Sequence, residues 1–473
     1  MSGDAPREAA AAGGRDEDMP RRTGRWRGQA GRLIALMQRP DVRGMAVVIL
    51  SKGVMVLLNF TLITLAARSL DTVNFGYYSV LYSAAALLYI VAAAGQELFV
   101  IRSWNEFIAA GDAARLKGVL RFTALISICG SLVVSACFFP WAQASFGAGT
   151  AAAATTFLVL ASMVQITMHL VRTSIGVGVG DGLGNFLSAG PAIVYLALCL
   201  LTGRDSSLGM LFVFLALGSS SALMLHLTLI RRLLRRIFPE IGSVAPVSRH
   251  AEWLGRSLRL WGANTTEAIN QYMDVLVIGY LMNPTVAGAY FVTVRLANLF
   301  AAAADSINLF ATRHFSGLYH RGERERLEEF LNSLAWITLA FICAGMVGIA
   351  IGGYFALLII NEAYTAYFPE LLVLCFGTAA LAIARPCGSI LMLTGHESRY
   401  LQVIAGSAAL RLAALFLLIP QFGVMGAVIA SALSFIAAAL VLWRLAVSLT
   451  GLDATVFRLF PRWASQTQAN AAE

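Results

Sequence analysis

The sequence predicts an all-α polytopic membrane protein, and two observations lead to this fold class. Charged residues make up 13% of the chain, whereas a soluble domain carries about 25%. The mean hydropathy is +0.72, and the apolar residues lie in long blocks. Each block is close to the roughly 20 residues that a helix needs to cross the hydrocarbon. So little charge cannot cover a water-exposed surface, and we therefore expect the blocks to be transmembrane helices.

Twelve apolar blocks can be distinguished along the chain. Their approximate limits are 44–66, 76–100, 118–141, 152–176, 186–202, 207–230, 258–282, 286–312, 328–352, 368–393, 400–419 and 423–446. The fifth block is short and contains Pro191, which makes its limits the least defined. We predict twelve transmembrane helices in two six-helix lobes around a central cavity.

The segments between and outside the blocks define the remaining parts of the chain. Residues 44–230 and 258–449 are expected to form the two lobes, and residues 231–257 a basic cytoplasmic linker. Residues 1–43 are predicted to be a basic, partly disordered cytoplasmic tail. Within it, Arg25 to Arg39 has the pattern of a short helix on the membrane surface. Residues 450–473 form a second cytoplasmic tail, and no signal peptide is recognisable.

Basic residues predict the orientation of the helices. The two tails and the even-numbered gaps carry 29 Lys and Arg residues, and the odd-numbered gaps carry two, Arg68 and Arg204. Cytoplasmic loops are enriched in Lys and Arg, so both termini are expected in the cytoplasm. This distribution reflects topology rather than a nucleic-acid-binding face, and no nucleic-acid partner is expected.

The two halves of the chain show a weak internal repeat. Gly76, Tyr78 and Val80 match Gly288, Tyr290 and Val292 at a shift of 212 residues, just before the second and eighth predicted spans or within them. Arg172 and Gly182 match Arg385 and Gly395 at a shift of 213. Parallel repeats related by an axis along the membrane normal are typical of transporters, whose substrate path lies between the halves.

Ionisable residues inside the predicted spans, together with the asparagines near them, are candidates for a functional site. A charge at bilayer depth costs at least about 2.5–3.5 kcal/mol and usually faces a cavity. The set consists of Lys52 and Asn59 in the first span, Glu267, Asn270 and Asp274 in the seventh, Arg295, Asn298 and Asp305 in the eighth, and Arg411 in the eleventh.

These residues allow two interpretations. In the first, they line a hydrated and partly cationic cavity for an anionic or sugar-bearing head group, because Arg binds phosphate oxygens in a bidentate fork. Glu267, Asp274 and Asp305 would then carry protons or hold Na⁺ as coupling ions. In the second, Arg295 pairs with a carboxylate and the set only fixes helix packing. The sequence shows no phosphate-binding loop for ATP hydrolysis and no metal-ligand cluster, so no other cofactor is expected.

Several short segments, in this order and at this spacing, make residues 44–449 resemble a known family. The chain is similar to Wzx-type flippases of O-antigen and exopolysaccharide repeat units, within the multidrug/oligosaccharidyl-lipid/polysaccharide exporter superfamily. The resemblance is carried by Ala66–Leu70, Phe75–Tyr78, Ala94–Glu97, Asp274–Tyr280, Gly288–Tyr290 and Phe422–Ala427.

The resemblance implies alternating access in the bacterial inner membrane and a role in surface polysaccharide biosynthesis. Its substrate class is an undecaprenyl-pyrophosphate-linked oligosaccharide, moved from the cytoplasmic to the periplasmic leaflet. Membrane lipids, a polysaccharide polymerase and a chain-length regulator are the other partners it implies. Cationic cavity residues of the family correspond here to Arg295, Arg411 and Lys52, and also to Arg68 and Arg385.

Three other functions stay open at this point. A cation-coupled drug antiporter of the same superfamily would be expected to have an acidic cavity lobe, whereas four cations lie inside the spans here. A membrane enzyme of polysaccharide assembly would be expected to have a large outward loop or an acidic metal-binding motif, and neither is recognisable. A scaffold for cell-wall synthesis without transport is the third alternative.

Overall fold

The computed structural model describes residues 40–321 and 323–459, and every regular element among them is a helix. Side chains are described from Ser51 on, except at several positions of α10 between 302 and 320. The surface helix predicted at 25–39 and the last fourteen residues of the second tail lie outside the described residues. The longer helices are α2 (Pro40–Ser69), α3 (Thr72–Ala92), α4 (Gln96–Ala109), α5 (Ala113–Phe146), α6 (Ala148–Ser174), α7 (Gly184–Thr202), α8 (Leu208–Ile237), α9 (His250–Leu281), α10 (Pro284–Arg321), α11 (Arg324–Ile360), α12 (Phe368–Leu393) and α13 (Glu397–Thr450).

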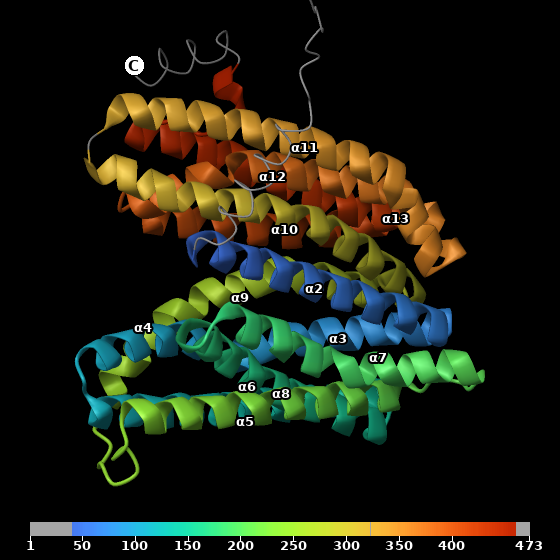
Figure 1. The fold of residues 1–473 in the computed structure, drawn as a ribbon. Coiled ribbons are helices and arrows are strands. Elements are labelled where there is room, and N and C mark those ends of the chain that lie inside the picture. The colour runs from blue at the N-terminus through green and yellow to red at the C-terminus, as the bar shows by residue number, and fades with distance from the viewer. Residues whose placement is uncertain (1–39, 322, 460–473) are drawn as a thin grey trace, which may run out of the picture. The chain divides into compact units, whose positions relative to one another are not determined.

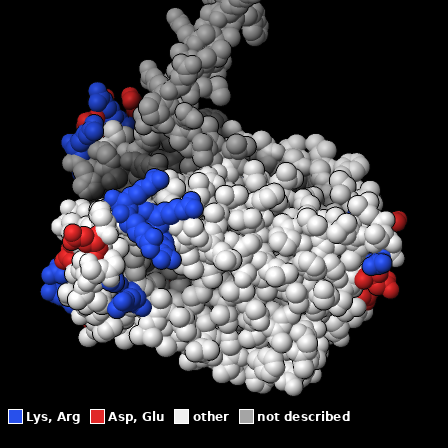
Figure 2. All heavy atoms as spheres, turned by 60° about the horizontal axis from the view of Figure 1, so that its bottom comes forward, with Lys and Arg blue, Asp and Glu red and all other residues white. Residues whose placement is uncertain are grey.

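These helices confirm an all-α polytopic membrane protein. Within the described part of the chain, nine helical segments are long and apolar enough to cross a bilayer. Figure 2 shows the same property on one face, where charged side chains stand at two ends and a broad uncharged band separates them. The count of twelve spans stays a prediction, because α9 and α10 are not among the nine and α13 counts once.

The predicted eleventh and twelfth spans lie within the single element α13, which is a helical hairpin. Gly423 has φ +58° and ψ −135°, values outside the helical region, and interrupts α13 near its middle. The two arms run back along each other, because the Ser407 hydroxyl donates to the Ser434 carbonyl oxygen at 3.2 Å and a Cβ on Gly426 would meet Leu418. The boundary predicted between residues 419 and 423 therefore falls at this reversal.

The predicted second span differs from the structure, which breaks it into α3 and α4. Ala94 and Gly95 both have positive φ, +51° and +74°, and end the first helix. The predicted fifth span also begins irregularly, with a π-helical turn at Gly178–Leu183 before α7. Both irregular points lie beside polar side chains that are described below.

Helix packing is described for the unit that begins at Ser51. Helices α5 to α8 pack mainly among themselves, as do α10 to α13, while α3 packs on both α9 and α10 (Figure 1). The largest buried cluster spans this contact and includes Phe75, Tyr78, Tyr290 and Phe291. The place where α3 meets α9 and α10 is therefore where the first half of the chain meets the second.

Candidate functional site

An aromatic cage around Arg295 lies where α3, α9 and α10 meet. The guanidinium carbon lies 4.8 Å from the ring centre of Phe291, 5.2 Å from that of Tyr272 and 5.9 Å from that of Tyr82. Arg295 is half-buried, and no described carboxylate lies within ion-pair distance of it. Its side chain also has a hydrogen-bond interaction with Tyr272. Without an acid beside it, the guanidinium keeps its charge for a ligand.

The cage is built by helix periodicity and aromatic packing. Phe291 and Arg295 are four residues apart on α10, so they lie on one face of the helix. Tyr82 meets Phe291 edge-to-face with ring centres 6.1 Å apart, and Tyr78 meets Phe291 at 6.2 Å. These rings come from both halves of the chain, and together they hold the guanidinium at the contact between them.

Arg411 lies instead in a closed polar network. Its exposed fraction is 5%, and its guanidinium forms an ion pair with the buried Asp274 carboxylate. The same guanidinium donates to the Ser431 hydroxyl at 3.1 Å and to the backbone carbonyl oxygen of Asn270 at 2.7 Å, and it lies over Phe435. The ion pair with Asp274 and the hydrogen bond to Asn270 join α13 to α9.

Three other predicted cavity residues lie on α2. Lys52 is exposed, and its charge interacts with Asp181 of the π-helical turn. The Asn59 amide donates at 2.9 Å to the carbonyl oxygen of Met55 in its own helix. The Nε of Arg68 donates at 2.8 Å to the Ile359 carbonyl oxygen at the end of α11. The structure does not bring these three together with Arg295 or Arg411.

The remaining predicted residues lie on α9, α10 and α12. Asn298 is half-buried one turn after Arg295, and Arg385 is half-buried directly before Pro386. Glu267 is exposed on α9. The side chain of Asp305 lies outside the part of the chain whose side chains the structure describes, so its predicted role in ion coupling has no geometry.

A second contact between the halves, which we call the inner seam, joins the α3–α4 break to the first half of α9. The Gln96 amide donates to Ser257 at 2.7 Å, Ser257 donates to the Ala94 carbonyl oxygen at 2.5 Å, and the Trp261 indole donates to the Val91 carbonyl oxygen at 2.9 Å. Glu97, which is 3% exposed, accepts from the amide of Asn264. The seam follows the basic segment 231–257, so it lies toward the predicted cytoplasmic side.

An apolar groove of about 570 Å³ lies beside the cage. It is lined chiefly by α3, α5 and α9, including Leu87, Phe138, Trp141, Leu276 and Tyr280. Leu87 and Leu276 also pack with Tyr272, one wall of the cage. The groove and the cage are therefore on neighbouring faces of the same α3–α9 contact.

The cost of burying a charge identifies the cation of the cage from the sequence, but nothing in the sequence identifies the rings. In the sequence, nothing distinguishes Tyr82 and Tyr272 from ordinary core aromatics. The four-residue spacing of Phe291 and Arg295 is a signal for their contact, because it places both side chains on one face of a helix. His169 and Arg172 lie one turn apart in the sequence, where a lone His is expected to be a packing residue, and the structure adds Asp181 to this pair. Arg172 lies 2.8 Å from the His169 ring and 3.5 Å from Asp181.

The sequence itself matches no known family model, and no curated protein matches it either. Solved structures do match. An inward-facing multidrug resistance transporter of the MATE family, in the MOP superfamily, aligns with 82% of this chain and 92% of its own, at 12% identity and a TM-score of 0.65. The lipid II flippase MurJ in an inward closed conformation aligns with 84% and 86%, at 13% identity and a TM-score of 0.64.

A third match is a MOP superfamily transporter from Pyrococcus furiosus, described as having a binding pocket of reversed polarity. It aligns with 86% of this chain and 94% of its own, at 12% identity and a TM-score of 0.55. At these identities the likeness establishes the fold. The chain is a multi-pass membrane protein with the fold of MOP superfamily transporters, whereas the resemblance to Wzx-type flippases within that superfamily stays a prediction.

Proposed function

We propose that the chain is a transporter that moves an undecaprenyl-pyrophosphate-linked oligosaccharide from the cytoplasmic to the periplasmic leaflet by alternating access. The observation that carries this proposal is Arg295, a half-buried cation with aromatic neighbours and no described carboxylate at ion-pair distance. A guanidinium left without an acid is suited to phosphate oxygens, which it binds in a bidentate fork. The fold shared with a lipid II flippase supports a lipid-linked substrate.

The geometry suggests how such a substrate would be held. The pyrophosphate would bind Arg295, and the sugars would contact polar side chains such as Asn298. The aromatic rings of Tyr82 and Tyr272 offer flat faces for sugar rings. The apolar groove beside the cage offers a place for the first part of the prenyl chain, so only the head group needs to leave the hydrocarbon.

Alternating access would open and close the two contacts between the halves. At the inner seam, four side-chain hydrogen bonds would break when the site opens to the cytoplasm. At the other end, Gly76 of α3 packs directly on the backbone of Pro284 at the start of α10. An anionic head group moving outward is favoured by an inside-negative potential, worth about 2.3 kcal/mol per charge per 100 mV. A proton or Na⁺ is the other proposed energy source, with Glu267, Asp274 and Asp305 as coupling residues.

The test is export by Arg295 variants in a strain that lacks the chromosomal gene. We expect Arg295→Lys to weaken surface glycan export, because it keeps the charge but loses the fork, and Arg295→Ala to abolish it. Complete lipid-linked repeat units should then accumulate on the cytoplasmic leaflet. Arg326→Gln is the matched control, because Arg326 is exposed and paired with Glu323 at 2.8 Å. Normal export by Arg295→Ala at normal protein level would refute the assignment.

A cation-coupled antiporter is the second candidate, and Glu267 is the observation in its favour. This carboxylate is exposed in the middle of α9, where a charge faces water rather than lipid. The likeness to MATE family structures is compatible with it. A deletion strain with normal surface glycan but altered drug sensitivity, corrected by the wild-type chain and not by Glu267→Gln, would favour the antiporter.

A further inference from the structure

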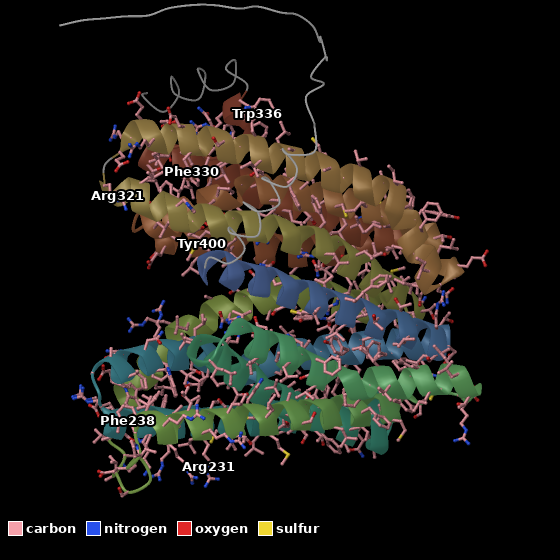
Figure 3. The ribbon with its side chains drawn as sticks, viewed as in Figure 1. Arg231, Phe238, Arg321, Phe330, Trp336 and Tyr400 are labelled. Carbon is pink, nitrogen blue, oxygen red and sulfur yellow. The ribbon has the colours of Figure 1, made fainter. Side chains whose placement is uncertain are left out.

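The last two turns of α8 carry a dense group of basic side chains. Arg231, Arg232, Arg235 and Arg236 are all exposed. None of the four forms an ion pair with a described residue. We call them the α8 arginine group. Figure 3 shows Arg231 pointing away from the helices. In the view of Figure 2, Lys and Arg side chains gather at one end of the molecule.

Several other arginines of the chain have a carboxylate partner, whereas the exposed Arg102, Arg121 and Arg399 form no ion pair with a described residue either. Arg115 pairs with Asp112 at 3.3 Å, Arg249 with Glu252 at 3.4 Å and Arg326 with Glu323 at 2.8 Å. Arg256 pairs with both Glu252 and Glu106. The α8 arginine group differs from the paired arginines in having no internal counter-charge, and from the single unpaired ones in bringing four exposed guanidinium groups together within six residues of one helix.

The direction in which the group projects identifies its partner. Met224 and Leu227 on α8 are 72% and 52% exposed, and in a membrane helix such a face contacts lipid. Arg231 follows Met224 by seven residues and Leu227 by four, so it extends the same lipid-facing stripe, and Arg235 follows one turn later. On the opposite side, Leu233 and Leu234 pack against the buried cluster around Trp253, which fixes the rotation of these turns.

We infer that the α8 arginine group is a binding site for the head groups of anionic phospholipids. The arginines lie directly at the end of an apolar helix that is long enough to cross a bilayer, and the phosphates of the surrounding lipids are expected at such an end. Four unpaired guanidinium groups beside a lipid-facing surface match a phosphate layer. A nucleic acid or an acidic protein would have to approach from the aqueous side, whereas the stripe turns Arg231 and Arg235 toward the bilayer. The site does not depend on which substrate the chain transports.

The test uses the purified full-length protein in a neutral detergent. Dioleoyl phosphatidylglycerol is titrated in, dioleoyl phosphatidylcholine is the neutral probe, and native mass spectrometry counts the bound lipids. We expect a preference for phosphatidylglycerol that R231Q/R232Q/R235Q/R236Q lowers by about tenfold or more, since one basic residue near an anionic surface is worth about fivefold. The control R115Q/R249Q/R256Q/R326Q removes the same number of charges from paired arginines and should keep the preference.

Smaller variants keep the proposal falsifiable if the fourfold Gln variant does not fold. R231Q/R235Q should lose more of the preference than R232Q/R236Q, because the first pair continues the lipid-facing stripe. The inference is overturned if the wild type shows no preference, if the Gln variant keeps it, or if the control loses as much. Binding of a short DNA duplex in place of phosphatidylglycerol would also overturn it.

Discussion

Replacing Arg411 with Met is expected to destabilise the protein strongly, because it leaves a buried carboxylate without its counter-charge. Asp274 is 3% exposed and is paired with the guanidinium of Arg411. Removing one partner of a buried ion pair costs about 3–5 kcal/mol. The expected loss for Arg411→Met therefore lies in that range, which is a large fraction of the stability of a typical domain.

The surroundings of Asp274 explain why little compensation is available. After the substitution, Asp274 Oδ2 keeps the hydroxyl donors of Tyr290 at 2.9 Å and Ser431 at 3.0 Å. Its other oxygen, Oδ1, is buried and has no hydrogen-bond partner among the described residues. Replacing both charges by apolar groups removes this problem, so D274L/R411M should be near wild-type stability or more stable by about 1–4 kcal/mol.

The assay is a double-mutant cycle of unfolding free energies in detergent. Arg68→Met serves as the control, because Arg68 is exposed and makes one described hydrogen bond, to Ile359. That control should change stability by less than about 1 kcal/mol. A stable R411M protein, or a double variant as unstable as the sum of the single ones, would refute the reasoning. Full export by D274L/R411M would further show that Arg411 does not contact the substrate.

Three other substitutions test the contact of Gly76 with Pro284, the inner seam and the loop after α8. A Cβ on Gly76 would lie 2.0 Å from the carbonyl oxygen of Pro284, so Gly76→Ala should cost about 1–3 kcal/mol of stability and lower the unfolding temperature. The control is Gly348→Ala, whose Cβ meets nothing within 4 Å, and equal unfolding temperatures of the two variants would contradict the prediction. Gly95 has φ +74° and packs on the α9 backbone, so Gly95→Ala should speed hydrogen–deuterium exchange across the α3–α4 break. Unchanged exchange would disprove this prediction. Lys117 donates to two loop carbonyl oxygens at 2.9 and 2.7 Å, so Lys117→Met should speed limited proteolysis of that loop, and identical digestion would count against the argument.

The fold class could be predicted from the sequence because hydropathy alone separates membrane helices from other elements. A block of about 20 apolar residues has few alternatives to a spanning helix. The irregular points could not be predicted. Ala94 and Gly95 have the composition of a small-residue helix segment, and only packing against Ser257 and Trp261 of α9 shows that the chain must turn there.

The candidate site was predictable in its charges but not in its neighbours. Burial cost points to any Arg inside a span, and it identified Arg295 and Arg411 alike. The structure places the first among rings and the second on a carboxylate. Which of these environments an arginine meets depends on the rotation of its helix against two others, and helix periodicity gives the face of one helix only.

The contact between Gly76 and Gly288 has a consequence for the predicted repeat. These glycines are counterparts at the shift of 212 residues, and a Cβ on Gly288 would lie 3.2 Å from the Cα of Gly76. A residue that touches its own counterpart lies near the axis that relates the two copies, as at an isologous interface. Tyr78 and Tyr290, also counterparts, are both nearly fully buried beside it. If the halves are related in this way, the contact of α3 with the start of α10 lies on the axis between them, where the two halves can tilt against each other.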